Sequence, residues 1–357
     1  MNIFFVQFIV IIFLGILFHR NQLNKRRNQY IILVSIMLVV LCGFRAQSIG
    51  ADMGVYLKHY KNCIEWSWSE LFAQRGEQNV LYYSCNKIFG SVLGLDFQYF
   101  KFIVSLISVA GISHVIKKYS NNVMMSYAVY IALGYYVFTF SGMKQTIATA
   151  VLCVAFDKMM QKKPKSFILC VLIAGLFHMP ALIFLPAYWI CSLKLNYKTA
   201  ILFIGIAALL MLFKGKIVEY LTLEYQSVVN QTESSGVGGK VVVMTAMLIF
   251  GYLFRRPSPD NRQYQILFNM MIIATLIQLL AVYGNVFERL SDYYFVFSFI
   301  YIPQAFFNND HEEKSIIVMD NKGMKFVQIC FIGLLSVYYL NILHDVYGLF
   351  PYKFFWQ

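Results

Sequence analysis

The sequence predicts an all-α fold, a polytopic bundle of transmembrane helices that forms a single integral membrane domain over residues 1–357. Hydrophobic residues make up 59% of the chain and charged residues only 13%, whereas soluble domains carry about 25% charged residues. The apolar residues gather in runs of roughly 14 to 21, and a helix needs about 20 residues to cross the hydrocarbon core. The net charge of +13 comes from Lys and Arg in short segments between the runs, which is a topology signal. We therefore expect the lipid bilayer as a partner and no nucleic acid.

About twelve apolar runs are candidate spans, and the range that we expect is about 10 to 12. In chain order the runs are Ile3–Phe18, Tyr30–Phe44, Phe97–Ile116, Val123–Phe140, Gln145–Met160, Ser166–His178, Pro180–Leu193, Thr199–Phe213, Val241–Phe254, Tyr264–Gly284, Ser291–Phe307 and Lys325–His344. The first run ends in a basic segment, which is typical of a retained span rather than a cleaved signal peptide. Pro180 and Pro186 interrupt residues 166–193, which therefore fit two short spans, one kinked helix, or a helix followed by a re-entrant segment.

The short basic loops decide the predicted topology. If the cluster around Lys25 is cytoplasmic, the loops near Lys117, Lys163, Lys194 and Arg255 fall on the same side, provided that residues 166–193 cross twice. This arrangement follows the positive-inside rule. Two larger loops, 45–96 and 214–240, then face outward together with the aromatic segment 347–356.

Two loop features have simple interpretations. Of seven cysteines, only Cys63 and Cys85 share the long loop 45–96, where an oxidising compartment permits a disulfide and two thiols are the alternative. The glycine-rich segment 234–240 lacks the spacing of a phosphate-binding loop, so we interpret it as a hinge or lid. Metal-ligand spacing is absent from the sequence, and we expect neither a metal nor a cofactor.

Several ionisable or polar residues stand at the predicted outer ends of apolar runs. Ionisable groups at membrane depth are costly, which makes such residues candidates for a functional site. They are Arg45, Lys144 with Gln145, His178, and Glu288, Arg289 and Asp292. Because they come from separate helices but one face of the membrane, we expect them to line a single pocket.

Each of these residues also has a simpler explanation. Arg45 and Lys144 fit cations that snorkel to lipid headgroups, and His178 fits a packed core histidine. Arg289 and Asp292, three apart on a helix, fit a local pair. Glu288 and Asp292, four apart, would repel each other unless a cation lies between them. The small residues Thr146, Thr149, Ala150 and Cys153 predict a helix face that a neighbouring helix approaches closely.

Four short motifs, in order over nearly the whole chain, carry a family resemblance. Residues 44–56 contain Arg45, Gly50, Asp52 and Tyr56 in an R…GxD…Y pattern. Residues 141–148 resemble RQxIA with Lys144 in place of Arg, and residues 176–183 resemble FHxSAL with Pro180 in place of Ser. Residues 287–295 resemble an R…YF segment. The chain thus resembles the EpsG-type family of Wzy-like polysaccharide polymerases.

The resemblance implies a multi-pass enzyme of the bacterial cytoplasmic (inner) membrane that assembles capsule, exopolysaccharide or O-antigen. Its substrate would be an oligosaccharide repeat unit linked to undecaprenyl diphosphate, polymerised at the outer leaflet. A chain-length regulator and a flippase of the same pathway are further expected partners.

The implied reaction assigns roles to the candidate residues. Departure of the diphosphate limits glycosyl transfer, and cations placed where its charge develops stabilise the transition state. Arg45, Lys144 and Arg289 are of the right type, although a Lys lacks the bidentate fork of an Arg. His178 is the candidate general base, because imidazole titrates near neutrality, and Asp52 is the second candidate.

The remaining polar residues complete the predicted site. Gln145, Glu288 and Asp292 would border it, and Asp52 would alternatively orient Arg45 or bind sugar hydroxyls. Tyr56, Tyr293 and Tyr294 would stack on sugars or belong to an interfacial aromatic belt, and we favour the belt. No cluster of outer-face carboxylates resembles a magnesium site, so the arginines would act without a metal.

Two other classes share parts of this pattern. A lipid-linked polysaccharide ligase would use the same Arg and His chemistry and differ only in its acceptor. An oligosaccharide transporter or flippase would also be a basic helical bundle, but it would show charges near the bilayer midplane and internal repeats, and neither is visible in this sequence.

The predicted topology can be tested by labelling introduced cysteines in intact cells with a membrane-impermeant maleimide. We expect Gly238→Cys to react, and Lys163→Cys and Pro257→Cys to react only after permeabilisation. Reaction of Gly238→Cys and Pro257→Cys from the same side would contradict the twelve-span topology.

Overall fold

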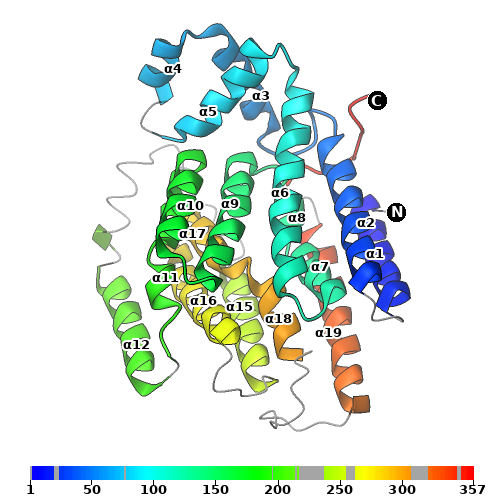
Figure 1. Cartoon of the computed structure of the whole chain (residues 1–357), viewed down its shortest axis with the longest axis vertical. Helices are drawn as coiled ribbons and strands as arrows, with labels where there is room; N and C mark the ends of the chain where they lie inside the picture. The colour runs from blue at the N-terminus through cyan, green and yellow to red at the C-terminus, as the bar shows by residue number, and fades with distance from the viewer. Residues whose placement is uncertain are drawn as a thin grey trace. The chain divides into compact units, whose positions relative to one another are not determined.

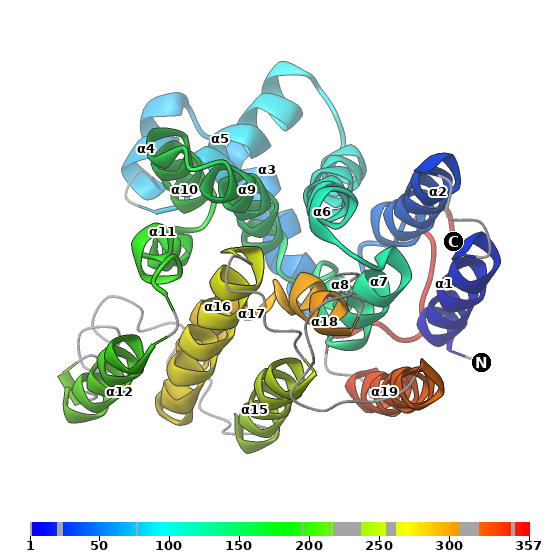
Figure 2. The ribbon, with the colours of Figure 1, turned by 60° about the horizontal axis from the view of Figure 1, so that its bottom comes forward.

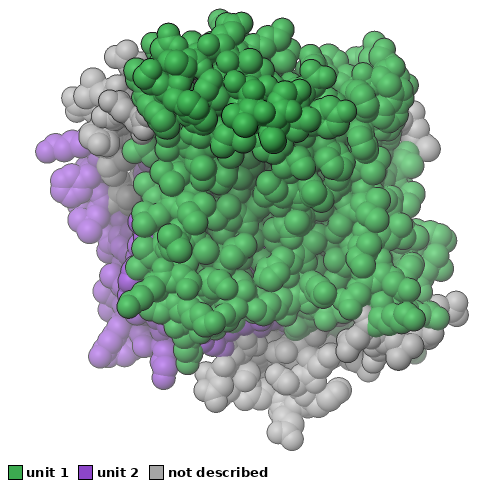
Figure 3. All heavy atoms as spheres, turned by 45° about the horizontal axis from the view of Figure 1, so that its top comes forward, with its two compact units in different colours: residues 1–182, 321–357 green, residues 183–320 purple. Residues whose placement is uncertain are grey.

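The computed structural model describes residues 2–19, 24–75, 78–194, 196–213, 215–216, 237–254, 262–306, 321–343 and 347–357. Within these ranges the regular elements are all helical, and the one extended pairing is an isolated β-bridge between Arg45 and Phe354. The chain forms two compact units (Figure 3), which are described separately. The first unit comprises Met1–Leu182 with Asn321–Gln357, and the second comprises Ile183–Asp320.

The first unit contains most of the long helices (Figure 1). Its elements are α1 (Ile3–His19), α2 (Asn24–Gly43), α3 (Met53–Glu65), α4 (Trp68–Arg75), α5 (Val80–Lys87), the π-helical turn η1 (Ile88–Val92), α6 (Phe97–Tyr119), α7 (Val123–Ala132), α8 (Tyr135–Phe138), α9 (Met143–Met160), α10 (Pro164–Phe177) and α19 (Asn321–Ile342). The 3₁₀ helix η2 (Met179–Phe184) runs from this unit into the second.

The second unit is smaller and is built around α16. Its elements are α11 (Ala187–Ile190), α12 (Tyr197–Leu212), α15 (Val237–Leu253), α16 (Arg262–Gln278), the 3₁₀ helix η3 (Leu279–Tyr283), α17 (Asn285–Phe295) and α18 (Ser298–Phe306). Within it, α16 packs against α15, α17 and α18.

Four of the described helices are long and apolar enough to cross a membrane. They cover Lys25–Gly43, Phe97–Tyr119, Arg262–Val282 and Lys322–Ile342. Other apolar helices are shorter, among them those in α1, α7, α10 and α15. The all-helical fold class is therefore confirmed, whereas the predicted number of about twelve spans is not.

Two predicted spans are broken rather than continuous, so both predictions are wrong in this respect. Residues 123–140 fold as α7 and α8, which meet at Gly134 with φ +84°, a left-handed conformation that glycine adopts without strain. Residues 291–307 are divided between α17 and α18. Residues 285–289, which lie between two of the predicted spans, form the start of α17.

The predicted outer loop 45–96 contains the short helices α3, α4 and α5, and its place at the outer face stays a prediction. In α3 the buried residues Met53, Tyr56, Tyr60 and Cys63 recur at helical spacing and form its packed face. Cys63 and Cys85 are thiols rather than a disulfide. Most of the predicted loop 214–240 lies outside the described residues, and its last four residues are the first turn of α15.

Helix α6 lies between α9 and α2 in the first unit (Figure 2). The contact with α9 is close, because a Cβ added to Gly111 would lie 2.7 Å from Cα of Ala150. The predicted small-residue face of residues 146–153 is therefore confirmed as a packing surface.

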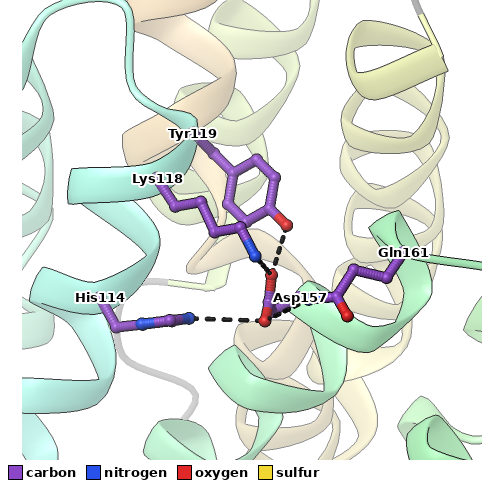
Figure 4. Close-up of polar contacts among 5 residues, drawn as sticks. All are labelled: His114, Lys118, Tyr119, Asp157 and Gln161. Carbon is purple, nitrogen blue, oxygen red and sulfur yellow. Dashed lines mark hydrogen bonds and ion pairs between the residues drawn. The ribbon is translucent and has the colours of Figure 1, made fainter. Parts of the chain in front are cut away.

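The end of α9 opposite Lys144 is fixed to α6 by a cluster around Asp157 (Figure 4). The buried Asp157 carboxylate accepts hydrogen bonds from Lys118, Tyr119 and Gln161, the last at 2.8 Å. Nε2 of His114 lies 3.6 Å from the same carboxylate. A buried carboxylate is stable only when it is paired in this way, so the cluster holds the two helices in one register.

Candidate functional site

Arg45 follows α2 directly and its side chain is only 1% exposed. The guanidinium donates to the carbonyls of Cys42 and Phe140, the latter at 3.3 Å, and lies 5.3 Å from the centre of the Phe140 ring. A third donor bond, of 3.3 Å, reaches Sδ of Met53. Snorkelling to headgroups is therefore the wrong explanation for Arg45, since its charged end points into the protein.

Asp52 does not orient Arg45, so that alternative is wrong. The Arg45 donors are directed at Cys42, Met53 and Phe140, while the Asp52 side chain is exposed at the start of α3 and makes no capping bond there. Its exposure leaves the Asp52 carboxylate accessible to a ligand.

Gly50 allows the segment after α2 to approach residues 140–141 very closely. Its φ is +113°, and a Cβ at this position would lie 2.1 Å from the carbonyl oxygen of Phe140. A hydrogen bond of 3.0 Å from the Ala51 amide to Oγ of Ser141 completes the contact. Only glycine fits here, and two of the four motifs, residues 44–56 and 141–148, are thereby joined.

The segment Tyr347–Gln357 pairs with the residues that follow α2 through backbone hydrogen bonds. Backbone hydrogen bonds of 2.8–2.9 Å connect the two segments, namely Ala46 N to Lys353 O, Gly50 N to Gly348 O, Ala51 N to Tyr347 O and Phe355 N to Phe44 O. The Tyr352 hydroxyl donates to the Leu41 carbonyl at 2.6 Å. Sequence reasoning noted the aromatic residues of this segment but did not connect them to Arg45.

Lys101 is a second buried basic group that sequence reasoning missed. It lies in α6, is 0% exposed, and its Nζ donates to the carbonyl of Arg45 at 2.7 Å. Among the described residues, neither Lys101 nor Arg45 forms an ion pair with a carboxylate. The signal that would have found it is a lysine inside the apolar run 97–116.

Lys144 lies among three tyrosines. Its Nζ is 6.0, 5.9 and 5.4 Å from the ring centres of Tyr56, Tyr82 and Tyr83, and it donates to the Tyr83 hydroxyl at 3.3 Å. Aromatic faces attract cations at such distances. The snorkelling explanation is thus wrong for Lys144, and the belt interpretation is wrong for the buried Tyr56. Gln145, the next residue, is 5% exposed.

His178 lies where helix α10 stops. Its backbone is extended, with φ −152° and ψ 102°, and its amide donates to the carbonyl of Ala174. The side chain is half-buried, and the next amide, of Met179, donates to Oδ1 of Asn79 at 3.1 Å. Of the arrangements predicted for residues 166–193, the structure has a helix that ends before Pro180, followed by the 3₁₀ helix η2.

The second unit contains the remaining predicted residues. Nζ of Lys240, in α15, lies 2.8 Å from Oε1 of Glu288 and 2.8 Å from Oδ1 of Asp292, both in α17. Lys240 is therefore the cation that the spacing of these two carboxylates requires, although sequence reasoning placed it in a loop. Arg289, on the same helix, is exposed.

The belt interpretation is also wrong for Tyr293 and Tyr294. Tyr293 is 0% exposed and Tyr294 2% exposed, and the Tyr294 hydroxyl donates to the carbonyl of Ile183 at 2.6 Å. Arg45, Lys144, Gln145 and His178 belong to the first unit, whereas Glu288, Arg289 and Asp292 belong to the second. That both sets line one pocket stays a prediction.

Comparison with known proteins finds one family. The model of the EpsG family matches residues 28–354, nearly the whole chain and all four motifs. No curated protein and no solved structure matches the chain.

The close approach at Gly50 can be tested by comparing two glycine substitutions. Gly50→Ala should destabilise the protein by several kcal/mol or prevent its accumulation, because both the φ angle and the contact with Phe140 exclude a side chain. Gly54→Ala is the matched control, since nothing lies within 4 Å of a Cβ there and α3 gains a better helix former. Equal melting temperatures of the two purified variants would contradict the contact.

Proposed function

The chain belongs to the EpsG family, whose members are in general polysaccharide polymerases of the membrane, and from this premise we propose that it polymerises oligosaccharide repeat units carried on undecaprenyl diphosphate. A hydroxyl at the non-reducing end of one unit attacks the anomeric carbon of the growing chain, and undecaprenyl diphosphate leaves. The product is a capsule, exopolysaccharide or O-antigen polymer, formed at the outer leaflet of a bacterial cytoplasmic membrane without a metal.

The observation that carries the proposal is the meeting of two motifs around Phe140. Arg45 and Gly50 contact the Phe140 carbonyl, and Lys144 follows four residues later at the start of α9. Basic groups from separate parts of the sequence are thus held on one rigid framework. Preorganised cations of this kind favour a transition state in which charge develops on a leaving diphosphate.

Arg45 is suited to binding the diphosphate because its competing partners are weak. Among the described residues its guanidinium donates to two backbone carbonyls, a thioether and the Cys42 thiol, all of them uncharged. Phosphate oxygens accept charge-assisted hydrogen bonds about twice as strong as those between neutral groups. Arg289 supplies a second fork and Lys144 a point charge. The tyrosines around Lys144 surround its ammonium with aromatic rings and one hydroxyl.

His178 is the proposed general base, with Asp52 as the second candidate. The helix end at Phe177 and the extended backbone at His178 expose part of an imidazole at a break in an apolar run. A neutral imidazole at this point would take the proton of the attacking hydroxyl.

The proposed topology places these residues at the outer face through about twelve crossings. The four long helices and the shorter apolar ones support the embedding of the protein in a bilayer. The short helices α7 and α10 would then cross only together with the segments that follow them.

The roles of the arginines can be tested in a strain that lacks the gene and expresses variants from a plasmid. Arg45→Ala and Arg289→Ala should abolish polymer and leave single repeat units on the surface, at normal protein levels, and Lys replacements should restore little. Arg27→Ala is the control, because among the described residues Arg27 donates to the backbone carbonyls of Lys117 and Ser120, and it lies about 27 Å along α2 from Arg45. Full-length polymer from either alanine variant would remove that arginine from the site, and polymer stranded on its lipid would indicate a ligase.

The role of His178 can be tested on the purified protein with a synthetic lipid-diphosphate substrate. His178→Gln should lower the rate by about 10²- to 10⁴-fold, the usual contribution of general-base catalysis. The wild-type rate should also fall as the pH drops through roughly 6.5, where imidazoles protonate. The rate of the variant should not show this fall. A variant rate within a few-fold of wild type would return His178 to a packing role and make Asp52 the base.

A further inference from the structure

A groove of about 930 Å³ opens beside Arg45 in the first unit and is not used by the proposed chemistry. It lies between α3, the start of α6, the residues that follow α2, and the segment Tyr347–Gln357. Its lining residues are Phe44, Gln47, Leu57, Tyr60, Lys61, Ile64, Leu95, Asp96, Phe97, Gln98, Tyr99, Phe102 and Phe355. The volume lies within the range of small-molecule sites, which is about 300 to 1,000 Å³.

The walls of the groove are braced by hydrogen bonds between its elements. The Tyr60 hydroxyl donates to the carbonyl of Leu95 at 2.7 Å, and Nε2 of Gln98 donates to the carbonyl of Gly43 at 2.6 Å. Burial, and secondly the charge of Asp96, raise the pKa of Tyr60 to about 12, so this hydroxyl keeps its proton. The ring of Phe355 stacks on that of Phe44 at 5.9 Å. The groove is therefore preformed.

The lining combines aromatic, aliphatic and polar side chains. Tyr99 is 57% exposed and Phe355 48% exposed, so both offer ring surface to a ligand. Gln47, Lys61 and Asp96 are also exposed. In the part of the chain that the structure describes, no ion pair joins Lys61 to Asp96, so a donor and an acceptor of hydrogen bonds are both available.

The aromatic rings and the exposed polar groups of the groove favour some classes of ligand over others. An isoprenoid tail makes only apolar contacts and would leave Gln47, Lys61 and Asp96 without compensation. A phosphate would be repelled by the Asp96 carboxylate. A sugar ring presents hydroxyls that both donate and accept hydrogen bonds, together with C–H faces that pack on aromatic rings.

We infer that this groove binds the glycan of the growing polymer, and that the bound part is the sugars nearest the diphosphate. The inference rests on the proposed function. Phe44 and Gln47, which flank Arg45 in the chain, line the groove, so a polymer whose diphosphate is held at Arg45 has the groove beside it. Contacts there keep the polymer bound between successive additions and so lengthen the product.

The inference predicts an effect on polymer length rather than on polymerisation itself. In the complemented deletion strain, Tyr99→Ala and the pair Lys61→Gln with Asp96→Asn should shorten the modal polymer about two- to five-fold, the change in dissociation rate expected from one lost contact of modest strength. The control is Phe72→Ala, an aromatic residue of α4 that is 49% exposed and lies outside the groove. Length is read on a gel of extracted surface polysaccharide, with protein levels matched.

A binding measurement on the purified full chain separates glycan from lipid. The probe is a mixture of oligosaccharides released from the strain's own polymer by partial acid hydrolysis. Wild type and Phe72→Ala should bind it equally, Tyr99→Ala more weakly, and undecaprenyl phosphate should not displace it. Unchanged polymer length, complete loss of polymer in Tyr99→Ala, or displacement by the lipid would each overturn the inference. A deletion strain that still makes full-length polymer would instead refute the proposed function.

Discussion

The contact between Gly50 and the carbonyl of Phe140 is the constraint on which the first unit depends. It brings the residues after α2 against the turn that begins α9 at a distance that no side chain permits. Because Arg45 donates to the same carbonyl, the position of its guanidinium and the starting point of α9 are set together. The location of Lys144 follows from that starting point.

A break in helical structure next to apolar segments leaves backbone groups that need hydrogen-bond partners. For the residues after α2, the segment Tyr347–Gln357 supplies these partners: three of its carbonyls accept hydrogen bonds and the Phe355 amide donates one. Lys101 satisfies the carbonyl of Arg45 in the same way. The surroundings of Arg45 thus include residues that are more than 300 positions apart in the sequence, such as Leu41 and Tyr352.

Hydropathy located the long helices because length and apolar content are local properties. The run 97–116 became α6 and the run 325–344 became α19 with small shifts at their ends. The helices α3 to α5 were missed because half of each helix surface is polar, so their residues resemble a loop when only apolar runs are sought. The break at Gly134 was missed because a glycine in an apolar run does not reveal its φ angle.

The site could be predicted in part for a related reason. Ionisable residues at the ends of runs identified Arg45, Lys144 and the carboxylates of α17, and their spacing called for a cation between Glu288 and Asp292. Which cation lies between them could not be predicted, because Lys240 is on α15, which is brought to the two carboxylates by its packing against α16 and α18. Lys101 and the segment Tyr347–Gln357 act through tertiary contacts that have no periodic pattern in the sequence.

Helix α9 is anchored by polar contacts at both ends, the tyrosines around Lys144 at one and the Asp157 cluster at the other. The two anchors are about 20 Å apart along the helix axis. Both anchors are contacts within the protein, so they set the position of α9 in the first unit. In a thinner or thicker bilayer, hydrophobic mismatch would fall first on helices such as α19, of whose apolar window only 17% is buried. The geometry around Arg45 and Lys144 would then change little with lipid composition.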